Sequence, residues 1–153
     1  MAGSIICAVD DSESACPVVH AAERLADNLD AELELVHVTH LEIPTRRSAR
    51  VSYEQLEARA LESGERLLRW AASECRTGAV RCRVEVGDPA HVLAQLSHQP
   101  GVELLVVGTR GRGHLKAAIM GSVSGEVATH ARCPVVIVPP AVRAPGHRRR
   151  ERS

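Results

Sequence analysis

Aromatic side chains are nearly absent from this chain. Its 153 residues include no phenylalanine, one tyrosine and one tryptophan. Proteins that hold single-stranded nucleic acid stack the bases on aromatic rings, so the sequence lacks the means to build such a surface. Acidic and basic residues balance to a formal net charge of zero, which also disfavours binding to nucleic acid or membranes through overall charge. We therefore expect a soluble protein with neither among its partners.

Long apolar runs and paired cysteines are lacking as well. No run approaches the length that spans a membrane, and the amino-terminal MAGSIICAVDD has no basic segment followed by a sustained apolar core, so we expect a cytoplasmic location. The cysteines are odd in number and include no C-x-x-C pair. We interpret all five as small buried side chains in a reducing compartment, not as a disulfide frame or a zinc site. They are Cys7, Cys16, Cys75, Cys82 and Cys133.

What the chain does contain is a regular alternation between short apolar runs and longer segments of helical period. The apolar runs predict five strands, at residues 4–9, 33–38, 80–86, 102–107 and 134–138. Helical spacing predicts a helix after Asp10-Asp11-Ser12, which would supply its N-cap. A long helix should run from the capping box Ser52-x-x-Gln55 to about Arg76. Two shorter helices are expected, one capped by Asp88 and one over residues 122–130.

Strands that alternate with helices predict a parallel sheet with helices on both faces. The strand at residues 80–86 alternates valine and cysteine with Arg81, Arg83 and Glu85, a pattern typical of an edge. The strands at 4–9 and 102–107 are the most apolar and should be central. The predicted fold is one α/β domain over residues 1–140, an open parallel five-stranded sheet in the order 3-2-1-4-5. Residues 141–153 carry little apolar content, and we expect a basic disordered tail there.

The opposite edge of this sheet would be the last strand, from Pro134 to Val138. Its sequence, PVVIV, carries no charge that would protect an exposed edge. We therefore expect a homodimer that forms through this strand.

Glycines mark both ends of the segment that follows the fourth strand. Gly108 ends that strand, and Gly111 follows three residues later. Gly121-Ser122 then begins the next helix. The predicted sheet order reverses between the first and fourth strands, where sheets of this kind bind ligands, and amides at a helix amino terminus bind anions. A phosphate chain therefore fits this segment best. The other interpretation is a flexible loop with glycines at its turns, since the spacing matches neither the P-loop nor G-x-G-x-x-G.

The stretch GTRGRGHLKAAIMGS resembles the G-x2-G-x9-G-[ST] motif of the universal stress protein family. AVDDS after the first strand, LVHV in the second and CPVVIV in the last are also similar to that family, and the resemblance covers about residues 3–139. It implies a Rossmann-like fold, a dimer through the last strand and membership of the ATP-binding branch, with Mg²⁺ or Mn²⁺ held through the phosphates. Gly113 adds a glycine to the loop that the motif does not require.

The resemblance also implies roles for individual residues. Asp10 would lie on the adenosine side of the nucleotide, and the backbone of Val38 would meet the adenine. The other matched residues would hold the ribose and the phosphates. They are Gly108, Gly111, Gly121, Ser122 and, through its amide, Val123.

The charged side chains between Gly108 and Gly121 are all basic. Arg110 and Arg112 could add charge at the phosphates or be solvated, and the segment contains no aspartate or glutamate. Hydrolysis needs a base and usually carboxylates that hold a metal ion. We therefore favour a regulatory protein in which bound ATP acts as a conformational switch toward an unidentified protein partner. A weak ATPase, and a dimeric interaction module that binds cyclic AMP or no nucleotide, are the alternatives.

Histidines and serines outside the motif receive structural interpretations. His37 and His40 lie three residues apart around a predicted strand and should face opposite sides, which argues against a metal pair. We interpret them as ordinary surface or core histidines, and His114 as a solvated loop residue. Ser12 and Ser14 have no neighbouring base to activate them, so we interpret them as helix caps.

Overall fold

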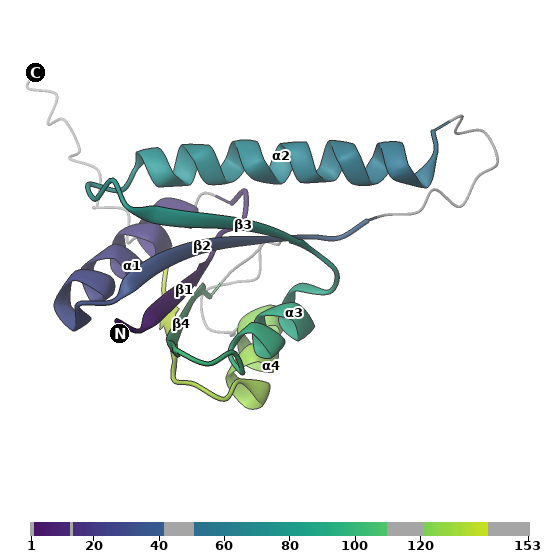
Figure 1. Cartoon of the computed structure of the whole chain (residues 1–153). Coiled ribbons are helices and arrows are strands. Elements are labelled where there is room, and N and C mark those ends of the chain that lie inside the picture. The colour runs from purple at the N-terminus through teal and green to yellow at the C-terminus, as the bar shows by residue number, and fades with distance from the viewer. Residues whose placement is uncertain (1, 13, 42–50, 110–120, 141–153) are drawn as a thin grey trace, which may run out of the picture.

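The computed structural model describes residues 2–12, 14–41, 51–109 and 121–140. Within them a five-stranded parallel sheet has the order β3-β2-β1-β4-β5, which confirms the predicted topology (Figure 1). The strands are β1 (Ser4–Ala8), β2 (Glu32–Thr39), β3 (Val80–Val86), β4 (Val102–Gly108) and β5 (Val135–Val138). The helices are α1 (Ala15–Leu29), α2 (Tyr53–Ser73), α3 (Pro89–Leu96) and α4 (Ser122–His130).

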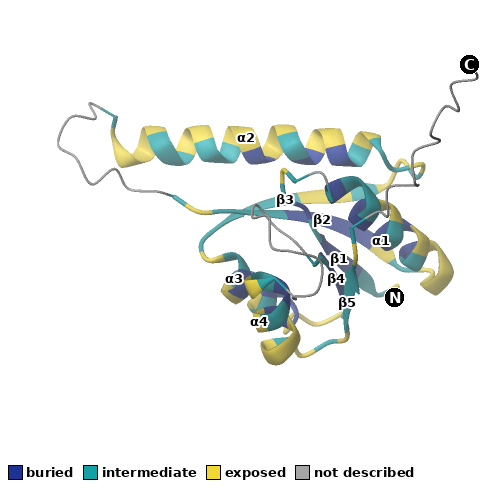
Figure 2. Ribbon diagram, turned by 180° about the vertical axis from the view of Figure 1, so that it is seen from behind, coloured by how far each residue is buried: buried dark blue, intermediate teal, exposed yellow. Residues whose placement is uncertain are grey.

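Helices cover both faces of the sheet, with α1 and α2 on one side and α3 and α4 on the other (Figure 2). Successive residues of a strand point to opposite faces. Ile5 and Cys7 of β1 accordingly belong to the core beneath α1 and α2, whereas Ile6 belongs to the core beneath α3 and α4. All three side chains are fully buried, as expected for a central strand of a parallel sheet.

The amino terminus of α1 differs from the prediction. Its N-cap residue is Ser14, whose side chain makes no capping hydrogen bond. Asp10 does not cap the helix, because its Oδ1 accepts hydrogen bonds from the Ser12 amide, at 3.0 Å, and from the Ser12 hydroxyl. A short side chain that accepts from the backbone two residues later closes a turn of its own. The prediction that Asp10-Asp11-Ser12 supplies the cap is therefore wrong, and these residues form a loop between β1 and α1.

The amino terminus of α2 has the predicted capping box. Ser52 Oγ accepts from the Gln55 amide at 3.2 Å, and Gln55 Oε1 accepts from the Ser52 amide at 3.1 Å. Further along, the helix approaches β3 closely at Gly64, where a Cβ would lie 2.8 Å from Val84 Cγ1. The absence of a side chain at Gly64 lets α2 lie directly on the strand.

A buried carboxylate on α1 holds the chain where α2 ends. Glu23 is 2% exposed, and its Oε1 accepts from the amides of Arg76 at 2.6 Å and Thr77 at 3.0 Å. Both residues consequently belong to the turn into β3. The last residue of α2 is Ser73, not Arg76 as predicted.

Ion pairs run along β3 and confirm that it is a protected edge. Arg81 pairs with Glu32 of β2 at 3.0 Å, and Arg83 pairs with Glu34 of β2 at 2.8 Å. Arg83 also lies 3.7 Å from Glu85 on its own strand. The opposite edge, β5, begins one residue after Pro134 and pairs only with β4 among the described strands.

The cysteines differ in exposure. Cys7 is buried and Cys82 is exposed, whereas Cys16, Cys75 and Cys133 lie between these extremes. The prediction of five buried side chains is therefore confirmed for Cys7 alone, because three cysteines are only partly buried and Cys82, on the edge strand, is exposed. All five thiols are free. Across the described ranges, no helix is both long enough and apolar enough to cross a membrane.

Candidate functional site

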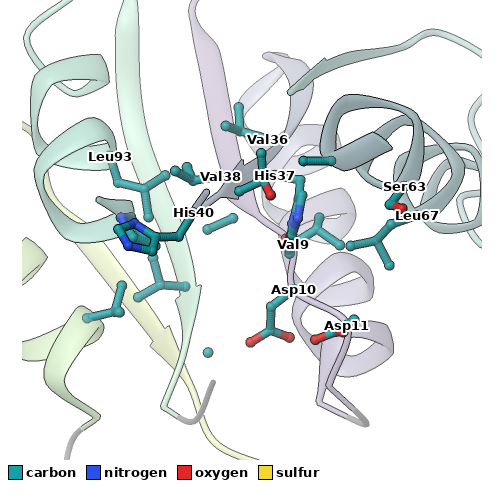
Figure 3. Close-up of a pocket in the computed structure, with 17 residues that line it drawn as sticks. Val9, Asp10, Asp11, Val36, His37, Val38, His40, Ser63, Leu67 and Leu93 are labelled. Atoms are coloured by element: carbon teal, nitrogen blue, oxygen red, sulfur yellow. Dashed lines mark hydrogen bonds between the residues drawn. The ribbon is translucent and has the colours of Figure 1, made fainter. Parts of the chain in front are cut away.

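A cleft of about 680 Å³ opens at the carboxyl edge of the sheet, where the strand order reverses between β1 and β4 (Figure 3). The ends of three parallel strands meet there, as the topology requires. Its lining comes from both faces of the sheet. α2 contributes Ala60, Ser63 and Leu67 on one side, whereas α3 contributes Pro89 and Leu93 on the other.

Four of the predicted site residues line this cleft: Asp10, Val38, Gly108 and Val123. They come from the loop after β1, from β2, from the end of β4 and from the first turn of α4. Gly121 and Ser122 are absent from the lining but lie immediately before Val123. Three others, Gly111, Arg110 and Arg112, lie outside the described residues, as do Gly113 and His114.

The two ends of the glycine segment touch each other. The Gly121 amide donates a hydrogen bond of 2.9 Å to the Thr109 carbonyl oxygen. Thr109 in turn donates its own amide to the Val138 carbonyl at 3.1 Å, which continues the ladder between β4 and β5. The start of α4 is therefore fixed against the end of the central strand.

Amides at the start of α4 are arranged to bind an anion. Gly121 is the N-cap, and the first bond of the helix runs from the Gly125 amide to the Gly121 carbonyl at 3.0 Å. The amides of Ser122, Val123 and Ser124 precede this bond and have no partner within the helix. They also lie at the positive end of the helix dipole. The Gly121 amide already donates to the Thr109 carbonyl oxygen and is not available to an anion. Gly121 can therefore contribute to anion binding only because it has no side chain.

Asp10 lies at the mouth of the cleft beside Asp11 (Figure 3). The bonds from Ser12 fix its Oδ1 and thereby orient the whole carboxylate. An oriented carboxylate is an acceptor suited to hydroxyl groups of a ligand. The turn that Asp10 forms with Ser12 prevents it from capping α1 and instead places its side chain in the cleft.

Two histidines that the sequence analysis treated as ordinary residues also line the cleft. His37 Nδ1 lies 2.7 Å from the Val9 carbonyl oxygen, so Nδ1 carries a proton and donates it. This bond holds the ring between β1 and α2, while His40 follows the end of β2 and lines the cleft separately (Figure 3). The sequence could have indicated that these histidines line the cleft, because both lie near the carboxyl end of a predicted strand, and parallel sheets bind ligands at that edge.

Comparison with known proteins agrees with this architecture. The model of the universal stress protein family matches residues 1–139. Universal stress protein YxiE of Bacillus subtilis is 30% identical over 147 residues, which cover 90% of this chain and 99% of that protein. The chain belongs to the universal stress protein family.

Solved structures share the fold at lower identity. One is a universal stress protein in complex with cAMP, with a TM-score of 0.64, 24% identity, and coverage of 91% of this chain and 98% of that one. Another is a universal stress protein family protein from Arabidopsis thaliana with AMP bound, with a TM-score of 0.63, 24% identity, and coverage of 92% and 93%. Both similarities confirm the five-stranded α/β architecture.

Proposed function

We propose that this chain is a regulatory protein that binds ATP in the cleft at the carboxyl edge of the sheet. The observation that carries the proposal is the meeting, in one cleft of about 680 Å³, of the end of β4 at Gly108 with the first turn of α4 at Val123. Amides at a helix amino terminus favour phosphate groups. The related structures that contain cAMP and AMP support an adenine nucleotide as the ligand class.

The proposal gives each predicted site residue that the structure describes a part in binding. The Asp10 carboxylate accepts from the ribose, and the backbone of Val38 meets the adenine. Gly108 and the amides of Ser122 and Val123 hold the phosphates, with Gly121 permitting the close approach. Gly111, Arg110 and Arg112 lie outside the described residues. We include them in the proposed nucleotide site because of the spacing of the glycine motif.

The same arrangement supports a switch rather than turnover. Phosphates bound at both Gly108 and the start of α4 would couple the nucleotide to the contact with a protein partner. The sequence of the segment offers no carboxylate for a metal ion, so Mg²⁺ or Mn²⁺ would be held through the phosphates. A single-turnover assay with labelled ATP tests this assignment, and turnover comparable with ordinary enzymes would overturn it.

The nucleotide site is tested by calorimetry with ATP, AMP and cyclic AMP. We expect wild-type protein to bind ATP more tightly than AMP, and Gly121→Val to weaken ATP binding by about 10-fold or more. Gly78→Val is the matched control, because a Cβ at Gly78 meets nothing within 4 Å. No binding of ATP by the wild type contradicts the proposal. Tighter binding of cyclic AMP than of ATP favours the alternative ligand.

The homodimer and the cytoplasmic location remain predictions of the sequence. β5 lies at an edge of the sheet and carries no charged side chain, which supports pairing with a second copy. We propose that residues 1–140 form the unit that dimerises. Light scattering at micromolar concentration should give the mass of two chains, and the mass of one chain would contradict this.

A further inference from the structure

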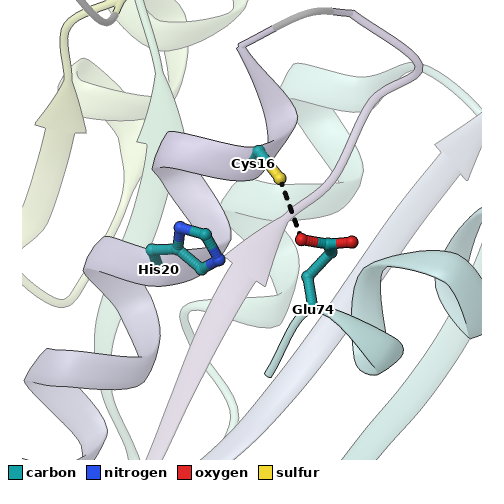
Figure 4. Close-up of side chains that lie close together, drawn as sticks. All are labelled: Cys16, His20 and Glu74. Atoms are coloured by element: carbon teal, nitrogen blue, oxygen red, sulfur yellow. Dashed lines mark hydrogen bonds between the residues drawn. The ribbon is translucent and has the colours of Figure 1, made fainter. Parts of the chain in front are cut away.

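Three side chains that can bind metal, from α1 and the end of α2, lie close together (Figure 4), and none of them lines the cleft. Cys16 and His20 lie one turn apart on the same side of α1, and Glu74 is the C-cap residue of α2. One ligand atom from each lies within 4.8 Å of the other two. Within the described ranges this is the one group of three or more such residues that meets this spacing.

The distances approach those of a tetrahedral zinc site. Bonds of about 2.0 to 2.3 Å from Zn²⁺ to nitrogen, oxygen and sulfur place neighbouring ligand atoms about 3.5 Å apart. Cys16 Sγ already lies 3.4 Å from Glu74 Oε2. The His20 ring belongs to an exposed side chain, so rotation about its side-chain bonds can bring a ring nitrogen inward by the remaining distance of up to about 1.3 Å. The backbone of either helix need not move.

The backbone is ordered both in α1, which carries Cys16 and His20, and at the end of α2, which carries Glu74. Spacing of four residues on one helix holds Cys16 and His20 on a common face. The chain just beyond Glu74 is held by Glu23 of α1, which accepts the amides of Arg76 and Thr77. A site whose supporting backbone is already ordered loses less entropy when it binds a ligand.

The hydrogen bond between Cys16 and Glu74 is present when no metal ion is bound. In this state the Cys16 thiol donates a hydrogen bond to Glu74 Oε2 at 3.4 Å. A thiolate is the form that binds a metal, and a cation that enters must displace this proton.

We propose that Cys16, His20 and Glu74 bind one zinc-class divalent cation, with water as the fourth ligand. One thiolate, one imidazole and one carboxylate select Zn²⁺ or Co²⁺ over Mg²⁺, which prefers oxygen ligands. Binding releases the thiol proton to solvent. None of the three residues lines the nucleotide cleft, so this is a separate site that joins α1 to the end of α2.

The experiment uses the untagged full chain, stripped of metal by a chelator and titrated with Co²⁺. We expect one equivalent to bind, with thiolate-to-cobalt charge-transfer absorption that Zn²⁺ abolishes by displacement and Mg²⁺ does not. Cys16→Ser should lose the absorption, and Glu74→Gln should weaken binding by about 10-fold or more. Cys82→Ser is the matched control, because its exposed thiol lies outside the cluster.

Two further measurements separate metal binding from folding. Zn²⁺ should raise the melting temperature of wild type and Cys82→Ser but not of Cys16→Ser, since a ligand stabilises the native state that binds it. Should Cys16→Ser fail to fold, Glu74→Gln alters only a C-cap side chain and carries the same test. Absence of stoichiometric Co²⁺ binding overturns the proposal. So does charge-transfer absorption that survives Cys16→Ser or disappears in Cys82→Ser.

Discussion

Gly121 and Thr109 approach each other so closely that no side chain fits between them. A Cβ on Gly121 would lie 2.6 Å from the Thr109 carbonyl oxygen, which accepts the Gly121 amide at 2.9 Å. The end of the central strand and the start of α4 are thereby held at one point. The nucleotide proposal depends on this contact, because it fixes the helix amides beside Gly108.

Replacement of Gly121 by alanine should therefore destabilise the fold even without ligand. Because the new methyl group meets backbone and not a flexible side chain, we expect the free energy of unfolding to fall by about 1 to 3 kcal/mol. Urea denaturation measures it. Gly78→Ala, placed in open space, should change the same quantity by less than about 0.5 kcal/mol. Equal effects of the two substitutions would refute the steric role of Gly121.

Asp10→Ala should weaken nucleotide binding, and it also removes the hydrogen bonds from Ser12 that close the turn after β1. The carboxylate is assigned to the adenosine side, so we expect affinities for ATP and AMP to fall together, by about 10-fold. Gly121→Val should instead affect ATP more than AMP. Calorimetry gives both affinities. Asp27→Ala, on the exposed face of α1, is the control, and a loss confined to ATP would place Asp10 at the phosphates instead.

Glu23→Gln tests the buried carboxylate beneath the turn between α2 and β3. The substitution keeps the shape but replaces charge-assisted hydrogen bonds to two amides with weaker ones, so unfolding should cost about 1.5 to 3 kcal/mol less. The control is Glu32→Gln, since both members of its pair with Arg81 are more than half exposed. That change should cost less than about 1 kcal/mol. A similar small effect for both would show that the turn does not depend on Glu23.

Thr109→Val should stabilise the protein. Thr109 Oγ1 is buried and, within the part of the chain that the structure describes, has no hydrogen-bond partner. Removal of a buried, unsatisfied hydroxyl while the shape is kept should raise the free energy of unfolding by about 1 kcal/mol. Thr129→Val serves as the control, because Thr129 Oγ1 already donates to the Gly125 carbonyl at 2.9 Å. A loss of stability at Thr109 would mean that its hydroxyl has a partner in solution.

Stability should fall at alkaline pH through two thiols, the buried Cys7 and the partly buried Cys75. Burial raises the pKa of Cys7 above its ordinary 9.0, and burial together with the Glu23 carboxylate raises the pKa of Cys75 to about 11. Below pH 9 the native and the unfolded chain both keep these thiol protons, so the thiols do not reduce the free energy of unfolding there. Above it the unfolded chain releases protons that the native chain retains. Stability is then lost, for Cys75 mainly between pH 9 and 11.

Urea denaturation at several values of pH measures this slope. Cys7 alone can contribute up to about 1.4 kcal/mol per pH unit, so Cys7→Ala should flatten the decline. Val106→Ala removes a neighbouring buried group that does not titrate and should lower stability by the same amount at every pH. Identical slopes for wild type and Cys7→Ala would contradict the prediction.

The strand order could be predicted because its signals are local. Charges alternate along β3, whereas β1 carries none and β4 carries only Glu103 near its start. This difference is visible in the sequence and separates an edge strand from the central strands. Local signals also predicted the part of the cleft that lies at the ends of strands, as at Asp10 and Gly108. Ser63 and Leu67 line it because of how α2 crosses the sheet, and no short sequence pattern encodes that crossing.

The cluster of Cys16, His20 and Glu74 shows a second limit. Four-residue spacing of Cys16 and His20 can be seen in the sequence, but the third ligand lies more than fifty residues further along. Its position depends on α2 ending at Ser73, which Glu23 determines from another helix. The absence of C-x-x-C therefore gave no information about a site assembled by tertiary contacts.

The charged ladder of Arg81, Arg83 and their glutamate partners has a consequence for assembly. A sheet with two open edges can add neighbours on both sides and grow without limit. Here ion pairs run along the β3 edge, so the predicted edge-to-edge pairing would use β5. Two copies that join through their β5 edges leave only guarded edges facing outward. The ladder on β3 would make such an assembly self-limiting.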